Sequence, residues 1–432
     1  MSVVATEPGF LTARRERAVA LQGSLELPRF RGIPGWEFFE LRGLDLDAYS
    51  PAPPPERPLP ASQALLQAPA GALTLTQVDT PNGSVVAGNG AAELPGPARD
   101  GRTAQPLVLP LAEAVRTHPE LVEPHLGRLV DASGPFTARN EAGWGGGAFV
   151  WVPAGVRCEA PVVLQALQAA AGSAMHWRCL IVLEEGAEAE VWDQYGSATA
   201  DGDGLFNAVV ELSIGPGARL RYLCGQGLGE KAWMFGTQRA EVGQEGSLEW
   251  VVLGFGAGRA RLRMDTALVG RGASARVTGA YASRGRQRLD FDTTQEHAAP
   301  DTTSDLAFRG VLGGRSSAVW RGMIRVDPGA QRTDAFQESR NLLLSDRAHA
   351  DAIPGLEIEA NDVRCTHAAA VAKVDAEQLF YLRSRGLPRE PAERLVIDGF
   401  MQALVERFPS GVAHDAVAAA LERRLGLLLD AG

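Results

Sequence analysis

The sequence predicts a mainly β protein whose centre is a β-helix-like core, with helical regions on both sides of it. Two observations lead to this fold class. Glycine turns recur at a nearly regular interval through the middle of the chain, and two segments near the C-terminus have the spacing of amphipathic helices. At 432 residues the chain is too long for one compact core, so several domains or an elongated repeat fold are expected.

The core is predicted from glycines that lie in short turns between strand-like segments. They are Gly155, Gly186, Gly217, Gly246 and Gly272, at intervals of 31, 31, 29 and 26 residues. The segment 182–191 shows the local pattern, in which two runs of alternating side chains flank a glycine turn. Units of this size indicate stacked coils of a solenoid, about 230 residues long in total. A β-sandwich or barrel is the alternative at this point.

The N-terminal part combines short helices with extended segments. A helix is expected over Phe10–Gln22, and the six prolines of Tyr49–Pro60 indicate a linker. Strand-like runs within Ala72–Ala87 surround Asn82-Gly83, which predicts a hairpin. Helical spacing returns over Leu111–Leu129, interrupted by two prolines.

Two helices are predicted near the C-terminus. The apolar face of the first consists of Ala392, Leu395, Val396, Phe400, Ala403, Leu404 and Phe408. The apolar face of the second consists of Ala413, Ala416, Val417, Ala420, Leu421, Leu425 and Leu428. Such faces must pack on the core, on each other or on a partner. The expected organisation is an N-terminal helical or mixed region at 1–134, a β-helix core at 135–374 and a C-terminal helical domain at 375–432.

Composition narrows the functional classes. The net charge of −10 argues against general binding to nucleic acid or to an anionic membrane surface. The four cysteines, Cys158, Cys179, Cys224 and Cys365, are far apart and include no C-x-x-C pair, which disfavours a disulfide framework. The first three are expected to be small apolar core groups. No signal peptide or apolar span is recognised, so the predicted location is the cytoplasm.

The most informative stretch runs from Leu342 to Gly386. After a turn predicted at Pro354-Gly355, the side chains of 356–361 alternate between apolar and polar, which predicts a strand with one face inward. If the following residues are also extended, Cys365 and His367 project from the same face. A thiol and an imidazole together are candidate ligands for iron, zinc or an iron–sulfur centre. A buried thiol beside a structural histidine is the alternative.

Catalytic motifs are not found. The segment nearest to a phosphate-binding loop, Gly225–Lys231, has Glu230 where the second glycine should be, so ATP binding is not expected. Neither G-x-S-x-G nor H-E-x-x-H occurs. Asp290 and Asp292 resemble the aspartates of polysaccharide-cleaving β-helix enzymes, which keeps a stand-alone enzyme acting on carbohydrate as the alternative function.

Several segments together resemble the SufB/SufD family, the scaffold subunits of the SUF machinery for iron–sulfur cluster assembly. They are Arg31–Glu37, Arg321–Val326, Gln337–Leu344 and, most clearly, Leu356–Asp375 followed by Glu377–Gly386. The resemblance is strong over the last third of the chain and thinner elsewhere. It implies that the core is a right-handed parallel β-helix, as in known members.

The chain resembles SufD-type members more than SufB-type members. Alignment on Leu342–Asp346 places Ser339 where SufB-type chains have a cysteine thought essential for cluster building, and serine is a poor iron ligand. The pair formed by Cys365 and His367 is typical of SufD-type chains. Ala368 departs from the pattern, because many relatives have glycine there.

The resemblance implies a non-catalytic scaffold, with ATPase activity residing in a partner. The partners would be a SufB-type paralogue bound through the β core and a SufC-type ABC ATPase bound through the C-terminal helices, with homodimers possible in isolation. The residues expected to contact partners are Tyr381, Arg383, Arg385, Phe400 and Leu404. An iron–sulfur cluster would be held only transiently, with Cys365 and His367 as ligands shared with the partner, and none would be bound stably by this chain alone.

Overall fold

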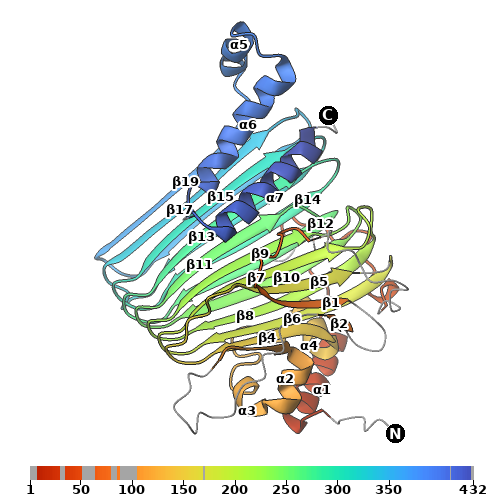
Figure 1. Ribbon diagram of the computed structural model, residues 1–432, viewed down its shortest axis with the longest axis vertical. Helices are drawn as coiled ribbons and strands as arrows, with labels where there is room; N and C mark the ends of the chain where they lie inside the picture. Colours follow the sequence, from red (N-terminus) through yellow and green to blue (C-terminus); the bar gives the residue numbers. More distant parts are fainter. Residues whose placement is uncertain are drawn as a thin grey trace.

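The protein is mainly β, and its core is a parallel β-solenoid with helices at both ends of the chain (Figure 1), which confirms the predicted fold class. The computed structural model describes residues 7–29, 35–50, 64–78, 85–87, 105–168, 171–408 and 410–429. Within these residues, no helix has the length and apolar character needed to cross a membrane.

The solenoid consists of two facing sheets, and each coil contributes one strand to each of them. The coil strands of the first sheet are β4 (Gly146–Val152), β6 (Ser173–Leu183), β8 (Gly204–Ile214), β10 (Trp233–Val242), β12 (Arg259–Leu268), β14 (Arg288–His297), β16 (Ser317–Val326) and β18 (His349–Ile358). Those of the second are β5 (Val162–Gln168), β7 (Glu188–Ser197), β9 (Arg219–Gly227), β11 (Ser247–Gly254), β13 (Ser274–Ser283), β15 (Thr303–Leu312), β17 (Thr333–Leu343) and β19 (Val363–Lys373). These sixteen strands make eight coils, and neighbouring coil strands are parallel.

Alternating side chains fill the space between the sheets. In β9 and β11, Tyr222 and Trp250 occupy the same register position one coil apart, and both are fully buried. Trp177 and Trp320, also fully buried, belong to the same apolar interior. Cys179 and Cys224 are buried in it as predicted. Because the strands are parallel and in register, one inward position per coil builds a continuous interior column.

The predicted glycine turns are confirmed, because all five glycines lie between consecutive strands of the solenoid. Gly155, Gly186, Gly217 and Gly272 adopt positive φ angles of 69°, 66°, 64° and 72°, a conformation that glycine tolerates best. The stacked turns are joined by backbone hydrogen bonds, such as the one from the Gly186 N–H to the Pro216 carbonyl, 2.8 Å long.

At the fifth turn, Glu245, the residue before Gly246, takes the left-handed conformation, with φ 53°. The Glu245 N–H donates to the Arg271 carbonyl of the next turn, as its glycine counterparts do. Two further coils place Asp301 and Arg332 there, with φ angles of 63° and 60°. The column of turns is therefore longer than its glycines indicate.

The N-terminal region covers the first coils. Its helices are α1 (Gly9–Ser24), the 3₁₀-helix η1 (Leu46–Ala48), α2 (Leu111–Thr117), α3 (Pro119–Val122) and α4 (Pro135–Gly143). Helices near 10–22 and 111–129 were predicted, with a break that the structure places at His118. Strand β3 (Leu107–Pro110) joins the first sheet antiparallel to β4.

The predicted hairpin is present as β1 (Leu73–Val78) and β2 (Val85–Ala87), which pair antiparallel. Strand β1 also pairs parallel with β5 and so extends the second sheet. The Asn82-Gly83 turn and most of the predicted linker at Tyr49–Pro60 lie outside the described residues, as does most of the Arg31–Glu37 segment.

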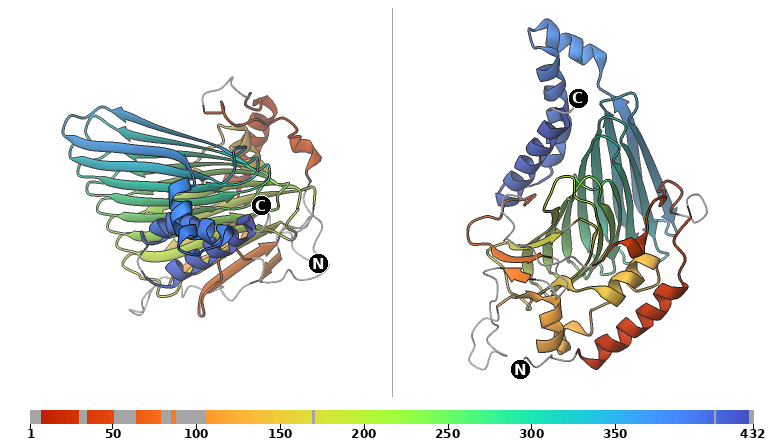
Figure 2. Two further views of the ribbon diagram at one scale, coloured as in Figure 1. Left: turned by 90° about the horizontal axis from the view of Figure 1, so that it is seen from above. Right: turned by 90° about the vertical axis from the view of Figure 1, so that its right-hand side faces the viewer.

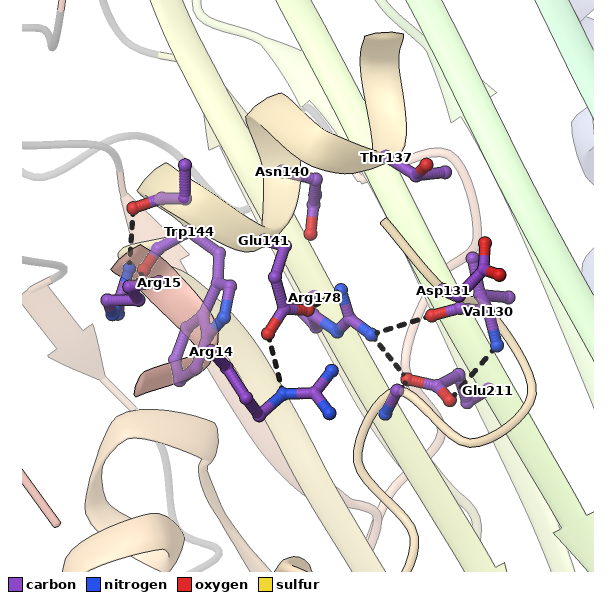
Figure 3. Close-up of polar contacts among 12 residues, drawn as sticks. Arg14, Arg15, Val130, Asp131, Thr137, Asn140, Glu141, Trp144, Arg178 and Glu211 are labelled. Atoms are coloured by element: carbon purple, nitrogen blue, oxygen red, sulfur yellow. Dashed lines mark hydrogen bonds and ion pairs between the residues drawn. The ribbon is translucent and has the colours of Figure 1, made fainter. Parts of the chain in front are cut away.

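A buried ionic cluster joins the N-terminal region to the solenoid (Figure 3). The Arg178 guanidinium of β6 is bound by Glu141 of α4 at 2.7 Å and by Glu211 of β8 at 2.6 Å. Glu141 also accepts a hydrogen bond from Arg14 of α1, 2.7 Å long. Glu211 accepts from the N–H groups of Gly127, Leu129 and Val130. Since Arg178 is only 1% exposed, removing either carboxylate would leave a buried charge poorly compensated.

The C-terminal region contains α5 (Ala376–Ser384), α6 (Arg389–Val405) and α7 (Val412–Leu429). Helix α7 and the second half of α6 lie on the outer face of the second sheet, over β13 and β15 (Figure 1). The predicted face of α7 is confirmed, but that of α6 is rotated. Its buried residues are Ala392, Ile397, Met401, Leu404 and Val405, whereas Leu395 is 54% exposed.

Candidate functional site

The two ends of the solenoid differ. Before the first coil, the two sheets end in short antiparallel strands, β2 with three residues, which pairs with β1, and β3 with four, which pairs with β4. The last coil ends in β18 and β19, with ten and eleven residues, and no described strand pairs with their outer edges. Long parallel edge strands with free backbone groups are templates for adding another strand.

Strand β18 is continuous through Pro354 and Gly355, so the predicted turn there is wrong. Pro354 pairs in register with Gly322 of β16, and Gly355 pairs with Met323. Proline lacks an N–H donor and is tolerated in a strand that lies at the edge of a sheet. The strand predicted at 356–361 therefore begins earlier than expected, at His349, and ends at Ile358.

Apolar side chains of the last coil are left uncovered at this end. Leu356 and Ile358 are in register with Ile324 and Val326 of the preceding coil. Ile324 and Val326 are fully buried, whereas Leu356 is 38% exposed and Ile358 41% exposed. Val371 of β19 is 44% exposed. These residues continue the interior columns, and they are exposed because the described part of the chain forms no ninth coil over them.

Cys365 and His367 lie on β19 and point the same way, toward the space between the sheets. They are in register with Ala335 and Gln337 of β17, which are both fully buried. Cys365 is half-buried against a small apolar cluster that includes Ile324. Burial, followed by the nearby Asp334 carboxylate, raises the pKa of the Cys365 thiol, so it is less readily ionised than a free cysteine.

His367 is exposed at the open end. Its neighbour in the preceding coil, Gln337, donates to the carbonyls of Gly322 at 3.3 Å and Gly355 at 3.0 Å, so this amide is used inside the solenoid. Because the His367 imidazole is exposed at this end, it can approach a group beyond the last coil. The described residues contain no group of three or more histidine, cysteine, aspartate or glutamate side chains arranged to hold a metal ion.

Ser339 lies on the inward face of β17, in register with Ala369, and is fully buried. Its hydroxyl accepts a hydrogen bond of 3.4 Å from Asn341. Ser339 thus lies one coil inside the open end, on the same side of the solenoid as the Cys365 and His367 pair.

The second exposed feature is the tip formed by α5 and the start of α6, which projects beyond the strands (Figure 2). No residue of α5 is buried. Phe380 is 74% exposed and Tyr381 is 56% exposed. The Arg385 guanidinium lies 5.1 Å from the centre of the Tyr381 ring, and Arg383 is exposed on the same helix. The sequence did not single out Phe380, although it lies beside Tyr381.

Two residues predicted to contact a partner pack within the chain instead. Leu404 is 1% exposed and belongs to the apolar layer between α6, α7 and the second sheet. Phe400 packs on the edge of this layer and lies 5.1 Å from the Arg309 guanidinium. The predicted contact through Leu404 is therefore wrong, because its helix face covers the solenoid.

The two aspartates considered for carbohydrate chemistry are neutralised by arginines. Asp290 is 2% exposed and lies 2.6 Å from an Arg261 nitrogen. Asp292 contacts Arg261 at 3.0 Å and Arg321 at 3.1 Å. These ion pairs join neighbouring strands on the outer face of the first sheet.

Comparison with known proteins gives consistent matches over this region. The family model for the SufBD core domain of SUF-system FeS cluster assembly matches residues 166–400. The iron–sulfur cluster assembly protein SufD of Bacillus subtilis (strain 168) is 32% identical over 316 residues, which cover 72% of this chain and 72% of that protein. An iron–sulfur cluster assembly SufBD family protein of Staphylococcus epidermidis (strain ATCC 12228) is 28% identical over 68% of this chain and 64% of that protein.

Proposed function

Because this chain belongs to the SufB/SufD family of iron–sulfur cluster assembly proteins and is most like SufD, we propose that it is a non-catalytic scaffold subunit of a SufBCD-type complex. The observation that carries the proposal is the open end of the solenoid. A stand-alone protein gains nothing from ten- and eleven-residue edge strands with exposed apolar side chains. A subunit that continues into a partner requires such an end.

The partner at this end is proposed to be a SufB-type paralogue. A second solenoid with a similar last coil could pair its edge strands with β18 and β19 and cover Leu356, Ile358 and Val371. A paralogue is favoured over a second copy because this chain offers Ser339, and no cysteine, in the coil behind the open end. In isolation, a homodimer would pair through the same edge strands, but it would offer no cysteine in place of Ser339 as a cluster ligand.

The iron–sulfur cluster is treated as cargo of the complex and not as a resident cofactor of this chain. Cys365 and His367 supply at most two ligand side chains on one face of β19, whereas a cluster takes about four. His367 is the better placed of the two, because it is exposed while Cys365 is half-buried with a raised thiol pKa. In this proposal a thiolate of the partner completes a shared and transient site.

A SufC-type ABC ATPase is proposed to bind the tip formed by α5 and the start of α6. Phe380, Tyr381 and Leu395 are exposed apolar side chains of these two helices, and α5 and the residue after it also carry the exposed Arg383 and Arg385. Aromatic and arginine side chains are common in the energetic centres of protein interfaces. The predicted location for the assembled complex is the reducing cytoplasm.

Co-expression with SufB-type and SufC-type proteins tests this function. We expect one stable complex on size exclusion, containing all three chains, that acquires iron–sulfur absorbance on anaerobic reconstitution. This chain alone is expected to acquire none. If the chain elutes by itself from such mixtures, or if it hydrolyses a carbohydrate without any partner, the scaffold proposal is wrong.

A further inference from the structure

A basic hollow lies on the rim of the solenoid, where coils pass from the second sheet to the first. Its volume is about 360 Å³. It is formed by three stacked turns of the solenoid together with the N-terminal loop at Arg42-Gly43. The side chains that line it are Arg42, Glu230, Lys231, Trp233, Arg259 and Arg286.

Positive charge dominates this hollow. Its one carboxylate, Glu230, is engaged by the Arg284 guanidinium at 2.7 Å. Arg42 is paired with Glu40 at 2.9 Å, and Lys231 with Asp201 at only 3.6 Å. The positive charges of Arg259 and Arg286, the other two cations of the lining, are not balanced by these pairs.

Two arginines of the hollow have no carboxylate partner among the described residues. Arg259 lies over the Trp233 ring, 4.5 Å from its centre, and donates to the Arg42 carbonyl at 2.6 Å. Burial and the neighbouring Arg288 lower the pKa of Arg259, and the nearby Glu40 carboxylate opposes this shift without forming an ion pair with it. Arg286 is exposed and forms no ion pair in the part of the chain that the structure describes.

Elsewhere on the solenoid, some arginines are paired with carboxylates of neighbouring coils. Arg221 of β9 lies between Glu190 of β7 at 2.8 Å and Glu249 of β11 at 2.6 Å. Arg325 of β16 is held in the same way by Glu296 at 2.8 Å and Asp327 at 3.2 Å. In the hollow, two arginines without such a partner among the described residues line one concave site together with Lys231, and this concentration of positive charge points to an external anion.

We propose that this hollow binds a small polyanion of the phosphate class, either free pyrophosphate or the diphosphate group of a nucleotide. Guanidinium groups bind phosphate oxygens in bidentate fashion, and a concave cationic site strengthens the attraction. Arg315 lies in the next turn of the stack, beside the turn that carries Arg286. Its N–H donates to the Gly285 carbonyl at 2.7 Å, which places it one coil from Arg286, about 5 Å away along the stack.

The test measures binding of pyrophosphate, and of ADP in a parallel arm, to the full chain by isothermal titration calorimetry at low ionic strength. One site per chain is expected. Arg286→Glu and Lys231→Glu should each weaken binding by about tenfold or more, because each removes a charge-assisted contact and adds a repulsive one. Both side chains are exposed, so the fold should persist. Arg17→Glu on α1, also exposed and unpaired among the described residues, makes the same change of charge elsewhere.

Tighter binding of ADP than of pyrophosphate would identify the nucleotide as the source, and equal binding would identify the free diphosphate. Absence of binding by both probes overturns the proposal, and so does equal weakening by Arg17→Glu, which would show a response to net charge alone. If Arg286→Glu leaves anion binding intact and only impairs assembly with other SUF subunits, the hollow is a protein interface and the small-anion site does not exist.

Discussion

At the scale of single residues, Cys365 and His367 share a face of β19 but differ in what surrounds them. Cys365 packs against the Ile324 cluster, so its sulfur partly serves as an apolar filler. His367 lies two residues further along, about 7 Å away, and reaches the open end. Although the two side chains share a face of β19, they therefore do not have equal access to a ligand outside the chain.

We expect His367→Ala to leave folding and complex formation near the wild-type level while lowering cluster formation severalfold or more. Cys365→Ala should have a smaller effect, since a small apolar group fits the half-buried position. Anaerobic reconstitution followed by visible absorbance measures both. His349→Ala is the matched control, because His349 is exposed on the adjoining strand β18 and pairs with Asp351. Wild-type cluster yield from the His367→Ala complex would favour a purely structural role for the pair.

A second residue-scale feature is Asp193, a fully buried carboxyl group inside the solenoid. It accepts hydrogen bonds from Tyr195 at 2.8 Å and Tyr222 at 2.9 Å, and from Trp177 at 3.4 Å. Its Oδ1 atom has no hydrogen-bond partner. Burial raises the pKa of Asp193 to about 6 although these hydrogen bonds oppose the shift.

Since this pKa is higher in the folded state than in the unfolded chain, the folded state binds more protons between about pH 4 and pH 6, and stability falls as pH rises through that window. We expect Asp193→Asn to remove this contribution. From pH 5 to pH 8 the wild type should lose about 1–2 kcal/mol of unfolding free energy relative to the variant. Paired denaturation curves at the two pH values measure it. An identical pH dependence of the two proteins would show that the carboxyl group does not titrate there.

At the scale of elements, the sequence was informative wherever a pattern is local. Alternating strands, the first helix and the face of α7 follow from side-chain spacing alone. The left-handed position at Glu245 was missed because a glycine follows it directly, and the stacked neighbouring turns, not the residue type, impose its conformation. The face of α6 was rotated in the prediction because Ile397 and Met401 lie over the solenoid, which helical spacing alone does not reveal.

The candidate site could likewise be predicted only in part, because local patterns do not reveal contacts between distant parts of the chain. Their spacing of two residues on a strand places Cys365 and His367 on one face, but their exposure arises because the described strands end at β18 and β19. The Arg178 cluster joins Arg14, Glu141 and Glu211 across long separations, and no local pattern indicates it. The basic hollow likewise combines an N-terminal loop with turns about 190 to 245 residues further along the chain.

For the helical tip we expect Phe380→Ala combined with Tyr381→Ala to weaken binding of the ATPase partner by about tenfold or more, since exposed aromatic anchors often contribute 2 kcal/mol or more to an interface. Point variants are preferable to deleting the chain from Ala392 onward, which would uncover the second sheet beneath α6 and α7. Binding is measured by surface plasmon resonance. Val19→Ala on α1, where Val19 is 59% exposed, is the control and should leave the affinity unchanged. Full affinity of the double variant would locate the ATPase elsewhere.

At the scale of the whole molecule, the two ends of the solenoid are built differently (Figure 1). The N-terminal end stops in short antiparallel strands, a common means of preventing further pairing. The other end keeps parallel register through to β18 and β19 and leaves its interior columns open. The molecule can therefore grow in one direction only, which favours a pair of solenoids over a filament.

This asymmetry gives a test with two matched residues on one strand. Leu356 and Ile353 are both 38% exposed on β18, but Leu356 faces the interior columns and Ile353 faces outward. We expect Leu356→Lys to weaken pairing with the SufB-type partner by about tenfold or more, because the ammonium group would be buried between two solenoids. Ile353→Lys should change it by less than about threefold, since its side chain stays on the outer surface. Sedimentation velocity on mixtures with the partner measures both. If Ile353→Lys disrupts pairing as strongly as Leu356→Lys, the partners do not join as continuous solenoids and a different face of the coil makes the contact.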